Sequence, residues 1–341
     1  MGKNKMRVIH APENIAGQSL TISRAQRKLG LISDVLVLMG SQYNYDYDYN
    51  LHLDRFPKMM DRFLRMMGFL FCLLRYDLIH FHYSTFYLPF QLDLKIAKFF
   101  KKKVIIQYWG SDVIQTDIAQ KYTLIDDNAL FEVYSGLNNE NKRNFLKEVQ
   151  KLVDISVVGD YSLLVYSPES CVIRQAIDLA LFDYVGVSPK KEEILIVHAP
   201  TKRNLKGTSY VIATIERLKS EKFQISFKLI ENLPHNEAIK IYREADIVID
   251  DIVQGPYGIL AIECMAFGKP VLDYINEAFI DYYPDLPIVN TNPDNLYNNV
   301  RFLLENPEIR VELGRAGRKY VELNHDAEII AAQLMELYNN L

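Results

Sequence analysis

The chain has 341 residues, which is enough for two domains of ordinary size. Apolar residues make up 49% of it and charged residues 24%, as in a water-soluble globular protein. The net charge of -4 argues against a nucleic-acid partner, which normally requires a strong basic excess. Three cysteines lie far apart in apolar surroundings, and the N-terminus lacks the apolar core of a signal peptide. We therefore expect reduced thiols and a cytoplasmic protein.

Strands and helices alternate in the first half of the chain. Apolar runs at residues 6–11, 35–39, 76–83 and 104–108 predict strands, with helices at 19–29 and 86–100 between them. This alternation predicts a doubly wound, parallel α/β sheet with ligands at the carboxyl ends of its strands.

Residues 54–75 carry methionines, phenylalanines and basic side chains at helical spacing. The basic residues are Lys58, Arg62, Arg65 and Arg75, and the apolar stripe is Met59, Phe63, Met66, Met67 and Leu70. Such a stripe packs against a protein core, or it belongs to a basic amphipathic helix on a membrane surface. Both readings stay open here.

Three polar groups of this half have a structural and a functional reading. Asp46 and Asp48 resemble a metal–diphosphate motif, although a polar exposed loop is the better reading of this stretch. His80 and His82 point to one face of a strand, as metal ligands or as structural histidines. Asp112 follows the strand that ends before Trp109, where it orients a neighbouring group or caps the next segment.

A second alternating domain begins at residue 194, after a polar linker at 182–193. The loop 200–207 contains Arg203 and Lys206, and Thr208 is placed to cap the helix that follows. A strand, a basic loop and a capped helix together predict an anion site, although a solvated turn has the same composition.

The stretch 246–272 predicts a strand, a glycine turn and a helix that ends at Gly268. The turn contains Gly255 and Gly258, and the free N–H groups of the helix start suit a diphosphate. Glu263 is the one charged residue of an otherwise apolar helix. It therefore needs either a basic partner or a ligand.

Tyr257, Gly258 and the run from Glu263 to Val271 resemble the donor-site signature of retaining GT-B glycosyltransferases of the GT4-like group. The family motif has two glutamates separated by seven residues. The second matches Glu263, which the resemblance implies holds the ribose of a nucleotide sugar. The first falls on Gly255, where backbone groups, Asp250 or Asp251 would substitute. The implied donor-binding set is Gly17, Arg203, Lys206, Gly207, Tyr257, Gly258, Ile259 and Glu263.

The resemblance extends to the first half of the chain. The segment from Asp77 to His82 resembles the Asp-x-x-His-x-His run of the family, which implies that His82 lies near the reacting sugar. Trp109 stands where the family commonly has histidine before Gly-x-Asp. The implied catalytic set is His82, Asp112, Arg203 and Lys206.

The resemblance implies two Rossmann-like domains facing a central cleft, at residues 1–185 and 186–325, with a terminal helix at 326–341 returning to the first. The implied activity is transfer of a hexose from a nucleoside diphosphate sugar to a glycan or lipid-linked acceptor, with no metal and no other cofactor. It belongs to polysaccharide or glycoconjugate synthesis at the inner membrane face, with residues Asp54–Arg75 contacting the membrane. A nucleotide-sugar epimerase or hydrolase, or a non-catalytic nucleotide-sugar-binding protein, is the alternative.

Overall fold

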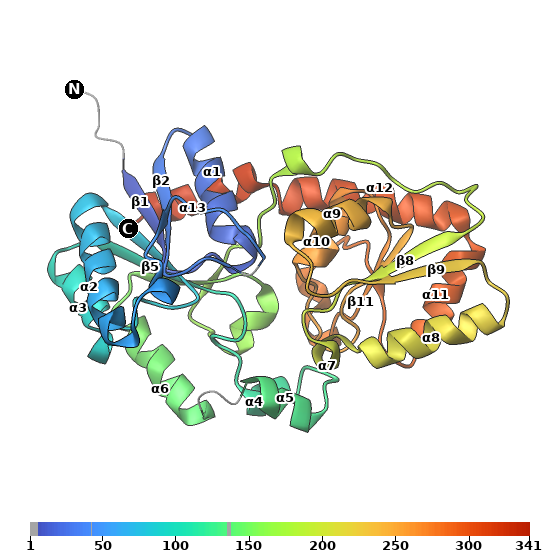
Figure 1. Cartoon of the computed structure of the whole chain (residues 1–341), viewed down its shortest axis with the longest axis horizontal. Helices are drawn as coiled ribbons and strands as arrows, with labels where there is room; N and C mark the ends of the chain where they lie inside the picture. The colour runs from blue at the N-terminus through green and yellow to red at the C-terminus, as the bar shows by residue number, and fades with distance from the viewer. Residues whose placement is uncertain (1–5, 42, 135–137) are drawn as a thin grey trace. The chain divides into compact units, whose positions relative to one another are not determined.

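The computed structural model describes residues 6–41, 43–134 and 138–341. The chain forms two compact α/β units, each built on its own parallel sheet (Figure 1). The first unit comprises Met1–Gln115, Leu137–Asp178 and Ala327–Leu341, and the second comprises Thr116–Gly136 and Leu179–Asp326. The main boundary between the two units thus lies at residue 178. The second unit also includes the segment Thr116–Gly136 from the middle of the chain.

The first unit has a seven-stranded sheet in the order β3-β2-β1-β4-β5-β6-β7. Its strands are β1 (Arg7–Ala11), β2 (Ile32–Val37), β3 (Tyr49–Asn50), β4 (Leu78–His82), β5 (Lys103–Tyr108), β6 (Ile155–Val158) and β7 (Cys171–Val172). All neighbours pair in parallel. The chain leaves β1 toward one edge of the sheet and resumes at β4 on the other side. This reversal is where ligands bind in open α/β sheets.

Helices cover both faces of this sheet. They are α1 (Gln18–Lys28), α2 (Lys58–Arg75), α3 (Leu92–Phe99), α6 (Asn139–Gln150) and α13 (Ala327–Asn339), with short 3₁₀ turns at Ile15–Gly17, Leu53–Arg55, Pro89–Gln91 and Tyr161–Val165. Strand residues alternate between two cores. Val8 and Leu78 face α1 and α13, whereas Ile9 and Ile79 pack with residues of α2 and α3.

The second unit has a five-stranded parallel sheet in the order β12-β11-β10-β8-β9. Its strands are β8 (Ile194–His198), β9 (Ile225–Leu229), β10 (Ile247–Ile249), β11 (Val271–Asp273) and β12 (Val289–Asn290). Its helices are α4 (Thr116–Ala119), α5 (Asp127–Tyr134), α7 (Arg203–Lys206), α8 (Thr208–Ser220), α9 (His235–Glu244), α10 (Ile259–Ala266), α11 (Leu296–Glu305) and α12 (Pro307–Asn324), with 3₁₀ turns at Leu179–Leu181 and Glu277–Tyr282. Helix α8 packs on α11, and α10 packs on α9 and α12 (Figure 1). The α/β fold class with two parallel sheets is confirmed.

Two local predictions in the second unit need correction. The basic loop 200–207 contains a helical turn, α7, so Arg203 and Lys206 lie on a helix. The residue before α8 is Gly207, and Thr208 provides no side-chain cap. The Thr208 hydroxyl instead lies 2.9 Å from Nε2 of buried His198, because the first turn of α8 packs onto the end of β8.

No helix in the described ranges combines the length and the apolar character that are needed to cross a bilayer.

Candidate functional site

The strand order of the second sheet brings the predicted donor residues to one edge. Strands β8 and β10 are neighbours, although β9 lies between them in sequence. Successive strands are therefore added on one side of β8 first and then on the other. The segments that follow β8 and β10 meet at the carboxyl ends of these two parallel strands. Helix α7 follows β8, and Asp250 and Asp251 follow β10 directly.

Lys206 lies between these two segments. Its ammonium group donates to Asp250 Oδ1 at 2.8 Å and lies 3.3 Å from Asp251 Oδ2. The lysine side chain is only 16% exposed, and both carboxylates are buried. Burial lowers the pKa of Lys206, but the two carboxylates outweigh this effect and hold the pKa above its usual value. An ammonium has three N–H donors, so one stays available to a ligand.

A third buried carboxylate, that of Asp273 at the end of β11, adds to this cluster. Neither of its oxygens has a hydrogen-bond partner within normal distance among the residues that the structure describes. Burial first, then the charges of Asp250 and Asp251, raise the pKa of Asp273 well above its usual value, and Lys206 opposes this only in part. Burial and these charges therefore favour the neutral form of Asp273, and Lys206 is the counter-ion of the other two carboxylates.

Arg203 is bound differently from Lys206, although one helical turn separates them. Its guanidinium group donates to both carboxylate oxygens of Glu231, at 2.8 and 2.5 Å. This fork is open to solvent, since more than half of the arginine side chain is exposed. Exposed ion pairs are weak and exchange readily, so Arg203 can release Glu231 and turn to another anion.

Glu263 of α10 is buried and is joined to the first residue of α9. Its Oε1 lies 2.7 Å from Nε2 of His235. Burial alone would lower the pKa of His235, but the hydrogen bond to Glu263 and its charge outweigh burial, so the pKa lies above its usual value. Glu231 and His235 lie in the same short segment after β9. Arg203 and Glu263 are thus each bonded to this segment, at the same edge of the sheet.

The start of α10 carries its own carboxylate. Gly258 is the residue before the helix and Ile259 is its first residue. The N–H group of Ala261 donates to Asp250 Oδ2 at 3.2 Å. The remaining N–H groups of the first turn are the ones left for an anion.

Two glycines of the site have a left-handed backbone. Gly207 has φ +69°, and a β-carbon there would meet Cγ1 of Ile252 at 2.5 Å. Gly255 has φ +105°, and a β-carbon there would meet the carbonyl oxygen of Tyr122 at 3.0 Å and Asn276 Cβ at 3.2 Å. Gly255 is thus a backbone requirement of this turn, which explains why no glutamate stands at this position.

Tyr257 points into the second unit. Its side chain is buried, and its hydroxyl contacts Nε2 of His325 at 2.9 Å and the hydroxyl of Tyr320 at 3.3 Å. The side chain therefore anchors the glycine turn to α12 and to the residue after it. Any donor contact of Tyr257 falls to its backbone.

In the first unit, Gly17 precedes α1 with φ +73°. A β-carbon there would lie 3.0 Å from the ring of Tyr45. The ring of Tyr45 therefore lies against Gly17, the glycine that the family resemblance implies is close to the donor phosphates.

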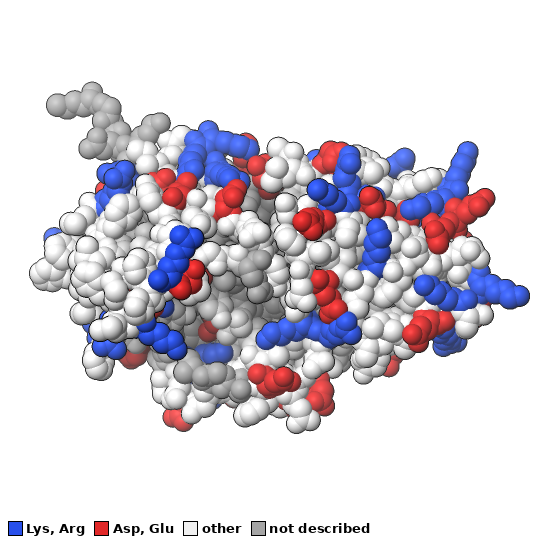
Figure 2. Space-filling view, viewed as in Figure 1, with Lys and Arg blue, Asp and Glu red and all other residues white. Residues whose placement is uncertain are grey.

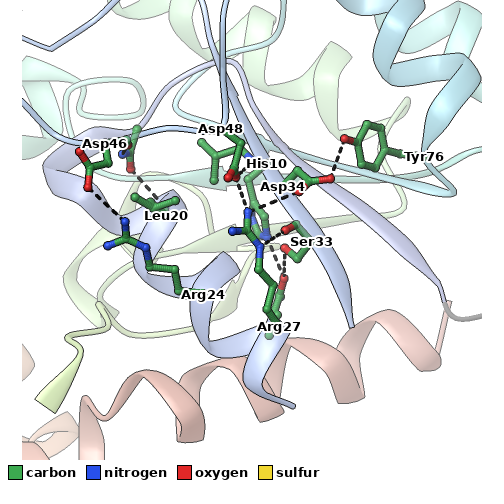
Figure 3. A network of polar contacts seen from close by, with 12 residues as sticks. His10, Leu20, Arg24, Arg27, Ser33, Asp34, Asp46, Asp48 and Tyr76 are labelled. Atoms are coloured by element: carbon green, nitrogen blue, oxygen red, sulfur yellow. Dashed lines mark hydrogen bonds and ion pairs between the residues drawn. The ribbon is translucent and has the colours of Figure 1, made fainter. Parts of the chain in front are cut away.

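Asp46 and Asp48 are both bound to basic side chains of α1. Asp46 accepts from Arg24 at 3.1 Å, and Asp48 pairs with Arg27 (Figure 3). Asp48 also accepts the N–H of Val35 at 2.8 Å. These contacts fasten the loop before β3 to the sheet and to α1, and they account for the two carboxylates without a metal.

A buried group of three histidines lies on β1 and β4, the neighbouring strands at which the strand order of the first sheet reverses. His10 of β1 stands beside His80 of β4 in the strand register, and His82 follows on the same face. Their ring nitrogens lie within 4.8 Å of one another, close enough for ligands of one metal ion. The sequence reading found His80 and His82 but missed His10, because a third residue on a neighbouring strand is visible only once the register is known.

These imidazoles form a directional chain of hydrogen bonds. The indole N–H of Trp109 donates to His82 Nδ1 at 3.3 Å, and His82 Nε2 donates to His10 Nδ1 at 2.8 Å. His10 Nε2 then donates to the Gln26 oxygen at 2.9 Å. The tautomers are assigned from these contacts. Metal binding would have to break the bond between His10 and His82.

The chain continues to the C-terminal helix. The amide of Gln26 donates to the Tyr338 hydroxyl at 3.2 Å, and that hydroxyl donates to His80 Nδ1 at 2.7 Å. His80 Nε2 is left without a partner among the described residues. Burial lowers the pKa of His10 to about 4 and those of His80 and His82 well below the usual value. All three rings are therefore neutral near pH 7.

His82 is fully buried, and both of its ring nitrogens are engaged. Its ring is nearly parallel to that of Trp109, at 12°. Asp112 accepts the N–H groups of Trp109 at 3.0 Å and Gly110 at 2.7 Å, so it fixes the turn after β5. Burial raises the pKa of Asp112 to about 7, against the effect of those two N–H groups. Together His82 and Asp112 hold Trp109 from its side chain and from its backbone.

The second unit resembles a known family in sequence. Residues 213–320 match the family described as glycosyl transferases group 1. This segment contains Glu263, Gly258 and Asp250, whereas Arg203 and Lys206 lie just before it. A comparison with curated proteins gave no match.

Solved structures match almost the whole chain. Sucrose-phosphate synthase from Thermosynechococcus elongatus is 16% identical with a TM-score of 0.67, and the match covers 99% of each chain. HepE from Anabaena in complex with UDP is 11% identical with a TM-score of 0.63, covering 98% of this chain and 100% of that one. Starch synthase IV from Arabidopsis thaliana, bound to ADP and acarbose, is 12% identical with a TM-score of 0.63, covering 99% of each chain.

The order of the strands, the whole-length structural match and the family segment in the second unit agree. The chain has the GT-B fold of these structures, and its residues 213–320 resemble the glycosyl transferases group 1 family.

Proposed function

We propose that the protein is a retaining glycosyltransferase that moves a hexose from a nucleoside diphosphate sugar to an acceptor hydroxyl. The observation that carries this proposal is the carboxyl edge of β8 and β10. There Arg203, Lys206 and the start of α10 adjoin one another. Glu263 is bonded to the first residue of α9, and Arg203 is bonded to the loop that leads to that helix. Cations and free N–H groups suit a diphosphate, and a buried carboxylate suits the ribose hydroxyls.

In the proposed reaction, the bond between the anomeric carbon and the donor phosphate oxygen breaks. The acceptor oxygen bonds to the same face of that carbon, and its proton passes to the departing diphosphate. Negative charge grows on the diphosphate in the transition state. Arg203, the third N–H of Lys206 and the first turn of α10 at Gly258 and Ile259 stabilise that charge, which is electrostatic catalysis. Fixed cations do this work in the proposed mechanism, without a metal or another cofactor.

Gly207 and the backbone of Tyr257 complete the donor site of the proposal, and Gly17 stands on the side of the first unit. Asp112 orients the turn that follows β5, where the acceptor is expected. We propose a positioning role for His82, because its ring is fully buried and accepts the indole N–H of Trp109. The UDP and ADP bound in the structural neighbours support a nucleotide donor.

The donor is tested by thermal shift against a panel of UDP-, GDP-, ADP- and TDP-sugars. A bound nucleotide sugar raises the unfolding temperature by mass action. Arg203→Ala is the matched variant, because its exposed side chain contributes little to folding. It should unfold at the wild-type temperature without donor and lose most of the donor-induced shift. A panel without any shift would refute the nucleotide-sugar site.

Turnover separates the proposal from its alternatives. Removing one electrostatic donor typically lowers kcat about 100- to 1000-fold, so Arg203→Ala should turn over at that fraction of the wild-type rate. Incubation with the donor alone distinguishes an epimerase or hydrolase, which would form an isomer or free sugar at full rate. Donor binding without turnover across a panel of glycan and lipid-linked acceptors would indicate a non-catalytic binding protein.

We place the activity in the cytoplasm, in the synthesis of a polysaccharide or glycoconjugate. Residues 54–75 provide the peripheral contact with the inner membrane face in this proposal.

A further inference from the structure

A buried series of hydrogen bonds joins the C-terminal helix to the turn after β5. Helices α1 and α13 lie side by side on the first sheet (Figure 1). Gln26 of α1 and Tyr338 of α13 are buried, whereas the lysine and arginine side chains seen in Figure 2 lie at the surface. We call the bonded side chains the buried network, and its members are Trp109, His82, His10, Gln26, Tyr338 and His80.

Trp109 stands at one end of the buried network. It is the only tryptophan of the sequence, and its indole can donate one hydrogen bond but accept none. That bond goes to His82 Nδ1, at 3.3 Å. The indole is half-buried and lies against Gly159, where a β-carbon would come within 2.8 Å of Cε3. His82 and Gly159 together therefore set the orientation of this ring.

The indole N–H fixes the direction of the bonds that follow. Burial keeps the pKa of the three imidazoles low, so each ring is neutral, with one N–H group and one acceptor nitrogen. Since His82 Nδ1 accepts from Trp109, His82 Nε2 carries the proton and donates to His10 Nδ1 at 2.8 Å. His10 Nε2 then carries its own proton and requires an acceptor. The oxygen of Gln26 is that acceptor, at 2.9 Å.

Two hydroxyl groups hold the Gln26 amide in this orientation. The hydroxyl of Ser33 donates to the Gln26 oxygen at 2.7 Å. The Gln26 amide N–H donates to the hydroxyl of Tyr338 at 3.2 Å, and that hydroxyl donates to His80 Nδ1 at 2.7 Å. The amide thus turns its acceptor toward His10 and its donor toward the C-terminal helix.

The opposite direction would break the contact with Trp109. If His10 carried its proton on Nδ1, His82 would have to accept at Nε2 and carry its own proton on Nδ1. That proton would face the indole N–H, and two donors cannot bond to each other. The assigned direction has a cost of its own, because His80 Nε2 has no partner among the described residues. The two directions are therefore closely balanced, and the Gln26 acceptor decides between them.

We propose that Gln26 and Tyr338 are positioning residues of the transfer reaction. They hold the buried network in one direction, so that His82 presents an acceptor nitrogen to Trp109 and fixes its indole at the turn after β5. This inference rests on the proposed function for one point, that the acceptor binds beside this turn. The C-terminal helix thereby contributes to the acceptor side of the site through a series of side chains.

The test compares Gln26→Leu with Gln26→Glu in the full chain. Leucine removes the acceptor of the His10 N–H, and a buried donor is costly to leave unpaired, whereas the indole bond that reversal gives up is long. The network should therefore reverse and release the indole. Glutamate keeps an acceptor oxygen in the same place and should preserve the direction.

NMR of the nitrogen-15-labelled protein measures this response, because one tryptophan gives one indole N–H signal. In Gln26→Leu we expect the signal to move and its exchange with water to become about fivefold faster or more. The protonated nitrogen of His82 should change from Nε2 to Nδ1. In Gln26→Glu the indole signal should stay close to its wild-type position.

Gln18→Leu is the matched control. Gln18 is a buried glutamine of the same helix, and its amide bonds the backbone of Ala176 at 2.9 and 2.7 Å, outside the buried network. This variant should lose stability but keep the indole signal of the wild type. If Gln26→Leu does not fold, Tyr338→Phe takes its place. It removes the hydroxyl that accepts from Gln26, and it should move the indole signal in the same direction by a smaller amount.

Turnover gives the second readout. Misplacement of a positioned group lowers rates strongly, so Gln26→Leu should lower kcat/KM for the acceptor roughly ten- to a hundredfold. Its donor-induced thermal shift should equal that of the wild type, and Gln18→Leu should keep the wild-type kcat/KM.

An indole signal that is unchanged in Gln26→Leu, or that moves equally in Gln18→Leu, would overturn the inference. So would a displaced indole with an unchanged kcat/KM, since the buried network would then serve stability alone. The NMR measurement needs no substrate. A protein without turnover would therefore refute the proposed function, while the indole signal would still decide whether Gln26 controls Trp109.

Discussion

The imidazole of His235 and the carboxylate of Glu263 lie 2.7 Å apart and join the start of helix α9 to helix α10. This contact explains how an apolar helix tolerates a buried carboxylate. One oxygen of Glu263 is engaged by the histidine, and in the proposed function the carboxylate also accepts a ribose hydroxyl. The pair also makes His235 a reporter of the site, because the carboxylate is what raises its pKa.

We expect Glu263→Gln to weaken donor binding and to lower the pKa of His235. Without the negative charge, the remaining influence on the histidine is burial, which lowers its pKa. The lost charge-assisted hydrogen bond to the ribose should weaken donor affinity roughly ten- to a hundredfold. Calorimetry measures the affinity, and an NMR titration measures the pKa. A lowered pKa with unchanged donor affinity would show that Glu263 serves the loop and not the ligand.

Lys206 and Arg203 should differ sharply when they are removed. Lys206→Met leaves the buried carboxylates of Asp250 and Asp251 without their counter-ion, and breaking a buried pair in this way costs about 3–5 kcal/mol. Arg203→Ala breaks an exposed pair and should leave the free energy of unfolding nearly unchanged. Urea unfolding of both variants measures the difference.

Lys206→Met with Asp250→Asn supplies the control for this comparison. Neutralising one carboxylate should recover part of the lost stability, and the recovered part is the coupling between the two residues. Equal stability of the two single variants would contradict the assignment of Lys206 as the counter-ion. A loss of activity in Lys206→Met would therefore combine lower stability with weaker diphosphate stabilisation. Arg203→Ala tests diphosphate stabilisation alone, because it leaves stability nearly unchanged.

Much of the fold could be predicted because its signals are local. The apolar runs at β1, β4, β5, β8 and β10 and the helix stop at Gly268 all lie within short windows of sequence. The partners within the sites are different, since they come from distant segments. His235 lies 28 residues before Glu263, and His10 lies on the strand beside His80. No periodicity reveals such pairs, because they depend on strand order and on which loops meet at one sheet edge.

The same limit applies to the charge state of the donor site. The sequence shows Lys206 as a free cation in a basic loop, and it shows Asp250 and Asp251 as strand-end acids. Only the parallel pairing of β8 with β10 places the acids against the lysine. Position in the sequence likewise predicts that residues 116–134 belong to the first domain. In the structure they belong to the second unit, where the N–H of Leu124 donates to the carbonyl of Val253 at 2.7 Å.

Gly255→Glu, which restores the family's first glutamate, should destabilise the protein and bring no activity. The left-handed backbone strains any side chain, at about 1–3 kcal/mol, and the new β-carbon presses on the carbonyl of Tyr122. Gly258→Ala is the matched control, because Gly258 has φ -112° and its nearest contact would be 3.7 Å away. Thermal unfolding compares the two variants. A Gly255→Glu protein as stable as Gly258→Ala would show that the turn adapts to a side chain.

Stability should fall as the pH drops below about 6.5, because buried histidines stay neutral in the native state. Burial lowers the pKa of His10 and His198 to about 4, and it lowers those of His80 and His82 well below their usual value. The unfolded chain takes up protons near pH 6.5 while the native state does not, so acid favours unfolding until the native pKa is reached. Each such histidine contributes a slope of up to about 1.4 kcal/mol per pH unit in that window.

Urea unfolding at a series of pH values measures the slope. His198→Gln should reduce the slope of the unfolding free energy with pH by the contribution of one histidine. The loss of the His198 hydrogen bonds lowers stability equally at every pH and leaves the slope unaffected. An unchanged slope in that variant would mean that His198 is protonated in the native state.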